Sequence, residues 1–272
     1  MLKSILRAVT PPILYEFAHM TRGAVLRSRA VPVATMPSVV YGCSGDYASW
    51  EQAAAECPGG YEQEAIIDVT LKSTRAARDT CSVALDVLSL RPLAGLQYAA
   101  GRAAANPVRV LDFGGAMGAH YFRLRRFLPY PVQWTIVEMP TTVKAARAEF
   151  SSNELKFEED VMAAGRADVV LASGALQYTS APYEIVRRLI ETGANWFVFD
   201  KVPLLMKERI TVQRVDPSLF DASLTCWIMA RAKFLEETSG LKMRLSWEMP
   251  DYASWIDGRP EYINHGFVFE RA

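Results

Sequence analysis

The spacing of hydrophobic residues changes near residue 106. Between residues 41 and 105 the apolar positions follow a helical period in an Ala-rich stretch, with no two-residue alternation. Ser49 is placed to cap a helix that begins at Trp50 and stops at Pro58. Three further helices are predicted over 62–77, 80–90 and 92–104. We therefore expect residues 37–106 to form a helical flank or lid.

From residue 107 onward, strand-like and helix-like segments alternate. Predicted strands cover 108–113, 133–138, 155–157, 168–172 and 195–200, and predicted helices cover 119–128, 141–150 and 182–191. Such alternation is typical of βαβ units in a parallel sheet with helices on both faces. Segments 241–249 and 263–271 are strands joined by a loop alone, which predicts an antiparallel hairpin. Residues 107–272 are thus expected to form one Rossmann-like α/β domain.

A glycine-rich turn follows the first of these strands. Gly114 and Gly115 permit positive φ and close approach to a ligand, and Gly118 allows the next helix to pack tightly on the strand. No G-K-[ST] sequence follows, so the turn is not a P-loop. Asp112 stands two residues before Gly114, where a carboxylate disfavours a diphosphate but suits a ligand that carries ammonium and sulfonium groups.

Acidic residues also end the next two strands. Glu138 lies at the end of the second strand, where a carboxylate can accept both ribose hydroxyls of an adenosine. The third strand ends near Glu158-Glu159-Asp160, where an acid, with Asp160 as the candidate, is placed to meet the adenine amino group. Since nothing cationic is positioned for a pyrophosphate, S-adenosylmethionine (SAM) fits these acids better than NAD.

Several motifs follow one another along the chain: Tyr47-Ala48-Ser49-Trp50, Leu111-Asp112-Phe113-Gly114-Gly115, Val137-Glu138, 168–178, Asp200-Lys201-Val202-Pro203, 209–213 and Cys226-Trp227. In this order they resemble a family of SAM-dependent methyltransferases found in bacterial gene regions for lipopolysaccharide and other surface polysaccharides. The resemblance spans roughly residues 40 to 270. It implies a class I methyltransferase fold with a helical N-terminal extension. Ala116 stands where the general class I loop prefers a glycine.

Two residues are candidates for a general base, which a poorly nucleophilic sugar hydroxyl would need. Asp200 closes the fifth predicted strand and should face the ligand cleft at the carboxyl edge of the sheet. His120 lies in the first turn of the helix after the glycine turn, and its ordinary pKa suits a base. The sequence leaves open which of the two takes the proton.

Other candidate binding residues follow the fourth strand and the fifth. Ser173 and Gly174 would present backbone carbonyls to the methionine ammonium, and Gln177 and Tyr178 would then line the cleft. A polar row of alternating residues, suited to hydroxyl or phosphate groups of a glycan, contains Arg209, Thr211 and Gln213.

Composition and charge exclude several classes of function. The chain has 272 residues, with 30 Lys plus Arg against 30 Asp plus Glu, so no cation excess favours nucleic acid as a partner. The four cysteines and three histidines are scattered without metal-ligand spacing, so we expect no metal site and no disulfide framework. A reducing cytoplasm is the expected compartment.

Residues 1–36 differ from the rest in charge. They carry five Lys or Arg residues and one Glu, and apolar residues recur at helical spacing on either side of Pro11-Pro12. Two interpretations stay open: a basic amphipathic strip on anionic lipid at the inner membrane, or a helix packed on the main domain.

Two alternatives to a SAM-dependent methyltransferase remain open. A scaffold of a polysaccharide assembly could keep the fold without catalysis, although it has no need of Asp112, Gly114 and Glu138 together. An NAD-dependent or nucleotide-sugar enzyme is disfavoured by Asp112 and by the lack of a Tyr-x-x-x-Lys pair. The oligomeric state is open.

Overall fold

A computed structural model describes residues 42–58, 60–80, 85, 87–215, 222–257 and 259–272. Its strands are β1 (Gly42–Tyr47), β2 (Val108–Phe113), β3 (Val132–Val137), β4 (Leu155–Glu158), β5 (Val169–Ser173), β6 (Trp196–Leu205), β7 (Arg209–Arg214), β8 (Ser223–Ala230), β9 (Leu241–Ile256) and β10 (Arg259–Arg271). Its α-helices are α3 (Trp50–Ala55), α4 (Glu64–Asp79), α5 (Val87–Ala100), α6 (Ala119–Leu124), α7 (Pro140–Phe150), α8 (Pro182–Glu191) and α9 (Arg231–Glu237). Three short 3₁₀ turns are η1 (Gly60–Glu62), η2 (Arg125–Phe127) and η3 (Leu176–Tyr178).

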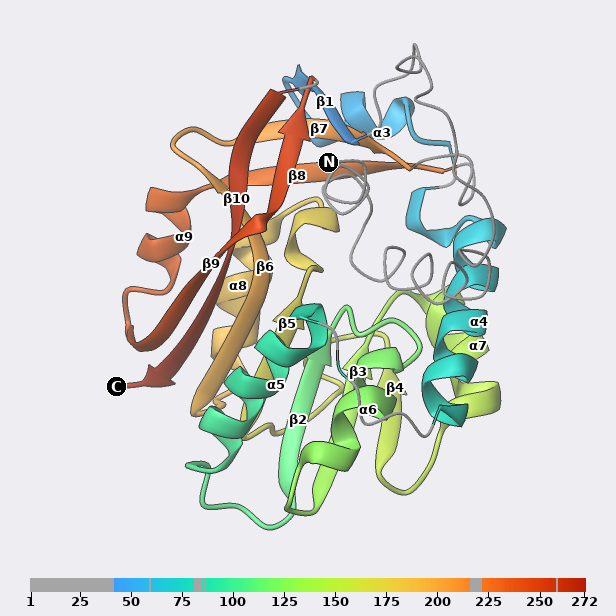
Figure 1. Cartoon of the computed structure of the whole chain (residues 1–272), viewed down its shortest axis with the longest axis vertical. Coiled ribbons are helices and arrows are strands. Elements are labelled where there is room, and N and C mark those ends of the chain that lie inside the picture. Colours follow the sequence, from blue (N-terminus) through green and yellow to red (C-terminus); the bar gives the residue numbers. More distant parts are fainter. Residues whose placement is uncertain (1–41, 59, 81–84, 86, 216–221, 258) are drawn as a thin grey trace, which may run out of the picture.

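The strands of the second half of the chain form the predicted mixed sheet. Strands β4, β3, β2, β5 and β6 lie side by side in this order and are parallel (Figure 1). The hairpin of β9 and β10 completes this side of the sheet, because β10 pairs antiparallel with β6. The structure therefore confirms a Rossmann-like sheet that ends in a C-terminal antiparallel hairpin, as expected for the class I methyltransferase fold.

Six strands also pair in a closed ring. The far end of β6 pairs with β8, β8 with β7, β7 with β1, β1 with β9, β9 with β10, and β10 with β6. The contact between β1 and β9 is the narrowest, with Cys43 opposite Ile256. Figure 1 shows β7 and β8 lying across the direction of β6, β9 and β10. This ring continues the sheet beyond the carboxyl end of β6.

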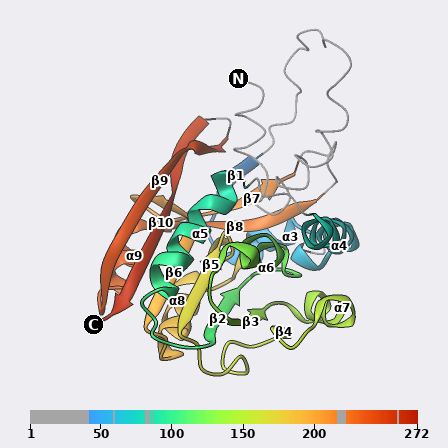
Figure 2. The same cartoon turned by 60° about the horizontal axis from the view of Figure 1, so that its bottom comes forward.

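Helices cover both faces of the parallel strands, and two apolar clusters hold them there. One cluster joins α5, α6 and α7 to the sheet through residues such as Leu96, Trp134 and Phe150. The other joins α8 and α9 to the opposite face through residues such as Val186 and Phe234. In Figure 2, the β9–β10 hairpin and α7 lie on opposite sides of the molecule. Both faces are therefore buried, which explains why β5 and the first half of β6 are a nearly continuous run of apolar residues.

Local sequence signals predicted approximately where most helices begin and end. Ser49 caps α3 as predicted, since its side chain accepts a hydrogen bond from the backbone N–H of Gln52. The predicted boundary between two helices at Pro92 is wrong, because α5 continues through this residue from Val87 to Ala100. Residues 101–104, the end of the predicted 92–104 helix, lie outside α5. Part of the predicted 80–90 helix lies outside the described residues.

The helical flank also contains a strand that the sequence did not predict. Strand β1 joins the sheet beside β7, although its residues show no apolar alternation. Strand β8 and helix α9 were not predicted either. Strands β6 and β9 extend beyond their predicted ends, because β6 pairs with β8 past Asp200 and β9 continues to Ile256.

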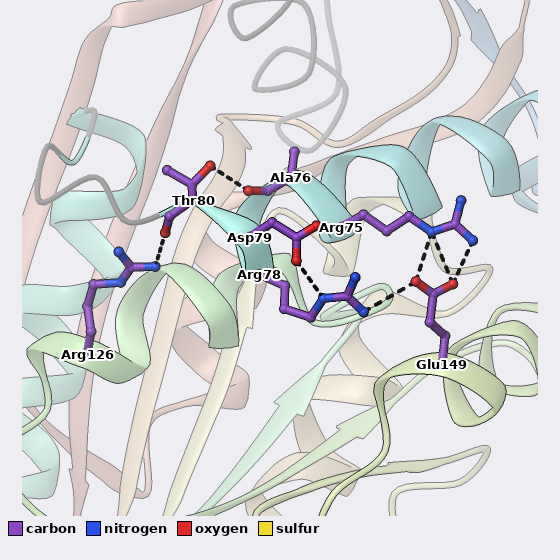
Figure 3. A network of polar contacts seen from close by, with 7 residues as sticks. All are labelled: Arg75, Ala76, Arg78, Asp79, Thr80, Arg126 and Glu149. Carbon is purple, nitrogen blue, oxygen red and sulfur yellow. Dashed lines mark hydrogen bonds and ion pairs between the residues drawn. The ribbon is translucent and has the colours of Figure 1, made fainter.

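Polar contacts attach α4 to the domain (Figure 3). The guanidinium of Arg75 donates to both carboxylate oxygens of Glu149 on α7, with distances of 2.6 to 3.1 Å. Arg78 donates to the same carboxylate and to Asp79. At the end of α4, the backbone carbonyl of Thr80 accepts a 2.6 Å bond from Arg126 in η2. These contacts fix α4 beside the sheet.

The basic segment of residues 1–36 lies outside the described residues, so its two interpretations stay open. Within the part of the chain that the structure describes, no helix has the length and apolar character required to cross a membrane.

Candidate cofactor site

The glycine turn connects β2 to α6 at the carboxyl edge of the sheet. Gly114 has φ of +68° and Gly118 has φ of +97°, a region that glycine adopts without strain. A Cβ atom on Gly114 would lie 2.2 Å from Cβ of Ala175, and one on Gly118 would lie 3.3 Å from Leu155. Glycine is therefore required at both positions. Ala116 also has a positive φ of 52°, so a glycine-like conformation is kept at the position where alanine replaces glycine.

Asp112 lies beneath this turn. Its side chain is fully buried, and Oδ2 accepts a 3.1 Å hydrogen bond from Nε1 of Trp134. Burial, together with the charge of Glu138, raises the pKa of Asp112 to about 7, against the effect of the Trp134 bond. Asp112 is not among the lining residues of the two cavities described below, but its carboxylate lies beside Gly115, where a Cβ atom would be 2.5 Å from Oδ2. Its direct contact with a ligand stays a prediction.

Glu138 follows β3 and faces a cavity. Its Oε1 accepts a 3.2 Å bond from the N–H of Ala116, and its Oε2 accepts a 2.9 Å bond from the N–H of Met139. Each oxygen keeps a second lone pair for another donor. Burial raises the pKa of the Glu138 carboxyl, whereas the two backbone bonds oppose this shift. The carboxylate is thus held in place and can accept two ligand hydroxyls.

Two cavities meet at the glycine turn. The smaller, about 20 Å³, is lined by Tyr61, Gly114, Gly115, Ala116, His120, Ser173 and Gly174. The larger, about 270 Å³, is lined by Tyr61, Phe113, Gly114, Val137, Glu138, Met139, Pro140, Glu159, Gly174, Ala175, Tyr178 and Thr179. Three residues belong to both linings: Tyr61, Gly114 and Gly174.

The linings of these two cavities have a distinctive charge. They include the carboxylates of Glu138 and Glu159 and the imidazole of His120, and no Lys or Arg is among them. A diphosphate would therefore find no cation among these residues, whereas a ligand with ammonium or sulfonium groups would find two acids. The charge of these lining residues therefore suits a cationic ligand better than an anionic one.

The two candidate bases are placed differently. His120, in the first turn of α6, lines the smaller cavity, and burial together with the charge of Lys201 lowers its pKa to about 3. Its imidazole is therefore neutral at pH 7. Asp200 is 1% exposed and lines neither cavity. Its carboxylate accepts 3.0 Å bonds from the hydroxyl of Ser173 and from Nε1 of Trp247, and burial raises its pKa.

Of the acids after β4, Glu159 and not Asp160 faces the larger cavity. Asp160 turns instead to α8, where it forms a 2.5 Å ion pair with Arg188 and accepts a 2.7 Å bond from the N–H of Met162. The sequence identified the acidic run correctly but could not tell which of its side chains points to the cavity.

The expected acceptor-binding residues do not form one group. Tyr178 lines the larger cavity, and its hydroxyl donates a 2.7 Å bond to Oε1 of Gln213 on β7. Gln177 is 5% exposed and lies outside both linings. Arg209 lies elsewhere, because its guanidinium donates to the carbonyl of Gly45 and to Asp257. The structure thus brings Tyr178 and Gln213 together, and places Arg209 at the turn next to β1.

Tyr61 is the main residue that sequence analysis missed. It comes from η1 in the flank, far in sequence from the glycine turn, and still lines both cavities. No local pattern marks it, because it lies in a short turn between two helices and its role depends on how α4 packs. Only the tertiary arrangement identifies it.

Comparison with known proteins gives structural likenesses only. No family model matches the chain, and no curated protein does. The N-terminal domain of EvdMO1, crystallised with SAH and D-fucose, is 12% identical, with a TM-score of 0.46 over 75% of this chain and 96% of that one. The glycopeptide N-methyltransferase MtfA, complexed with SAM, is 13% identical, with a TM-score of 0.43 over 69% and 98%.

A third similar structure is LepI in complex with SAM. It is 15% identical, with a TM-score of 0.46, and the match covers 77% of this chain but 53% of LepI. All three structures contain SAM or SAH, and that is a fact about those proteins. With TM-scores of 0.43 to 0.46, these likenesses do not assign this chain to a family, so its function must be inferred from its own site.

Proposed function

We propose that the protein is a SAM-dependent methyltransferase. One observation carries the proposal: two adjoining cavities at the carboxyl edge of a Rossmann-like sheet are lined by two carboxylates and one imidazole, with no Lys or Arg among the lining residues. Ligands of open α/β sheets bind at this edge. SAM combines an adenosine with two positive charges and one carboxylate, and this set of groups suits such a lining.

The proposed cofactor contacts divide between the two cavities. Glu138 would accept the ribose hydroxyls, and Glu159 is placed on the same cavity for the adenine amino group. Backbone groups of Gly114, Ser173 and Gly174 would hold the methionine part beside the smaller cavity. When bound, SAM supplies a methyl group on a positively charged sulfur, an excellent leaving group. The protein contributes mainly alignment, which can supply roughly 7–11 kcal/mol.

His120 is the proposed general base. It lines the smaller cavity, and its imidazole stays neutral at physiological pH because burial and the charge of Lys201 keep its pKa near 3. A neutral imidazole can accept a hydrogen bond and then the proton from an acceptor hydroxyl, although with a pKa this low it is a weaker base than an ordinary histidine. Asp200 is proposed as a positioning residue, since its carboxylate holds the hydroxyl of Ser173, which lines the cavity.

The proposed acceptor is a saccharide or lipid-linked glycan of the bacterial surface, methylated on oxygen. The sequence resemblance to methyltransferases of surface-polysaccharide gene regions supports this choice. The pair of Tyr178 and Gln213, next to the larger cavity, offers hydroxyl and amide groups for such an acceptor. We propose that the basic residues 1–36 bring the cytoplasmic protein to the inner membrane, where lipid-linked glycans are assembled.

Isothermal titration tests the cofactor. The full chain should bind SAM and S-adenosylhomocysteine (SAH), and should not bind NAD. No heat with millimolar SAM or SAH, for a protein shown to be folded by circular dichroism, would refute the proposed function. Binding of NAD in place of SAM would refute it equally.

Transfer of a labelled methyl group tests the reaction and the acceptor. Glycans extracted from the source bacterium should gain label and 14 Da per methyl with the wild-type protein, at a rate about 10²-fold or more above that of His120→Ala. If SAM binds but no glycan is labelled, the proposed glycan acceptor is refuted while the proposed cofactor stands. Sedimentation with anionic liposomes, with and without residues 1–36, tests the membrane role.

A further inference from the structure

Tyr61 lines both cavities of the candidate cofactor site. It shares this position with Gly114 and Gly174, but these two belong to loops at the strand ends, whereas Tyr61 comes from η1 in the N-terminal flank. Glu138 lines one cavity and Ser173 the other, so a ligand that contacts both must extend into both cavities. Such a ligand would lie next to Tyr61, which lines each of them.

The surroundings of Tyr61 connect it to the acceptor side. Its ring centroid lies 5.3 Å from that of Tyr178, with an angle of 51° between the rings. Its ring also packs on an apolar cluster that includes Ile66 and Leu224. Tyr61 and Glu138, the carboxylate proposed to hold the ribose, line the same larger cavity, and burial, followed by the charge of Glu138, raises the pKa of the Tyr61 phenol.

Hydrogen bonds from the two neighbouring residues anchor η1 over the site. Oε1 of Glu62 accepts a 2.6 Å bond from the hydroxyl of Thr141 at the beginning of α7. Nε2 of Gln63 donates a 3.3 Å bond to the carbonyl of Ser223 on β8. The turn that carries Tyr61 is thus held from two sides. The bond between Glu62 and Thr141 can break at low cost, because both residues are exposed and water can replace either partner.

We propose that Tyr61 is a cofactor-binding residue: its ring turns aside to join the two cavities and then packs against bound SAM or SAH, between the ribose and the methionine. This inference rests on the proposed function. It assigns a part of the cofactor site to the N-terminal flank, so that α4 and η1 complete a site whose other residues come from the sheet. An aromatic ring at this position contributes contact area and favours the cationic sulfonium.

Titration of SAH into three variants of the full chain tests the proposal. Tyr61→Ala should weaken SAH binding by about tenfold or more, since an aromatic contact of this kind accounts for roughly that factor. Tyr61→Phe keeps the ring and should stay within about threefold of wild type. The matched control is Tyr98→Ala, which removes a half-buried ring of α5 that packs on Trp196 away from both cavities and should leave SAH binding unchanged.

The outcomes distinguish the two proposals. If the wild-type chain fails to bind SAH, the proposed function is refuted and Tyr61 loses its role with it. If wild type binds and Tyr61→Ala binds equally well, Tyr61 alone is refuted. Hydrogen exchange on the wild-type chain covers the case in which Tyr61→Ala does not fold. SAH should slow amide exchange over residues 61–66, and unchanged exchange there would overturn the inference.

Discussion

Nε1 of Trp134 donates a hydrogen bond to Oδ2 of Asp112 across 3.1 Å, and both side chains are fully buried directly below the glycine turn. Asp112, two residues before Gly114, thus has a hydrogen-bond partner within the protein, the indole of Trp134 on β3, whether or not it also acts on a ligand. Its carboxylate lies close to Gly115 of the turn, where a Cβ atom would be 2.5 Å from Oδ2, and it is not among the residues that line the two cavities. Glu138 and Glu159 are the acids that line the larger cavity.

Asp112 should make stability depend on pH near neutrality. Its pKa is about 7 in the folded protein and about 3.9 in an unfolded chain, so folding favours the protonated form. The contribution is complete below pH 4 and is lost as the pH rises through about 7. The unfolding free energy of wild type should therefore fall between pH 5 and 8 by up to about 3 kcal/mol more than that of Asp112→Asn.

Urea denaturation at pH 5, 6, 7 and 8 measures this difference. Asp79→Asn is the control, because Asp79 is exposed and its pKa is lowered by Arg78 and not raised. Curves for wild type and Asp112→Asn that run parallel over this pH range would contradict the assigned environment of Asp112.

Gly115 should not tolerate a side chain while Asp112 is present. A Cβ atom there would lie 2.5 Å from Oδ2 and 2.6 Å from Cγ of Asp112. Gly115→Ala should lower the unfolding free energy by about 1–3 kcal/mol and weaken SAH binding. Adding Asp112→Ala to this variant removes the clash and should restore part of the loss. The control is Gly240→Ala, which meets nothing within 4 Å. Additive losses in the double variant would refute the clash.

Glu138 should contribute to cofactor affinity through its charge. Glu138→Gln keeps the shape of the side chain but replaces one carboxylate oxygen by a donor, so one ribose hydroxyl loses its acceptor. The Kd for SAH should rise about ten- to hundredfold, because hydrogen bonds to charged groups contribute about 1.5–3 kcal/mol. Glu158→Gln is the control: Glu158 ends β4, pairs with Arg147 and lies outside both linings. Equal affinities for the two variants would exclude Glu138 from the site.

The ion pair between Arg75 and Glu149 should stabilise the attachment of α4 only slightly. The two side chains are 50% and 27% exposed, so solvent screens the pair and a double-mutant cycle should give about 1 kcal/mol or less. The pair of Arg187 and Glu237 has similar exposure but a single 3.2 Å contact, and its coupling should be smaller. The coupling energy between Arg75 and Glu149 should fall in 1 M NaCl. A coupling energy that does not change with salt would contradict an electrostatic origin.

Local periodicity predicted the parallel strands and most helices because their signals lie within a few residues. The run from Val108 to Phe113 is β-branched and ends in glycines, and α8 begins at Pro182 and ends before Gly193. Strand β1 escaped prediction because its sequence, GCSGDY, has neither alternation nor high β-propensity. It is a strand because β7 and β9 lie on either side of it, and such partners are not visible in a short window.

The sequence predicted which strand ends and loops form the candidate site, but not which side chains there point into the cavities. The glycine turn and Glu138 were identified, since the order of strands fixes which ends meet at the carboxyl edge. Whether Glu159 or Asp160 faces the cavity depends on Arg188, which pairs with Asp160 from α8. The role of Tyr61 depends on the position of the flank, which no spacing in the sequence encodes.

The ring of six strands has a consequence for any shortened form of the protein. Removing residues up to Tyr47 would delete β1 and leave the backbones of β7 and β9 with unpaired N–H and C=O groups. Such open strand edges recruit strands from other molecules. Trimming the amino terminus past β1, as if the half of the chain that carries the candidate site were an independent unit, should therefore yield a protein that self-associates.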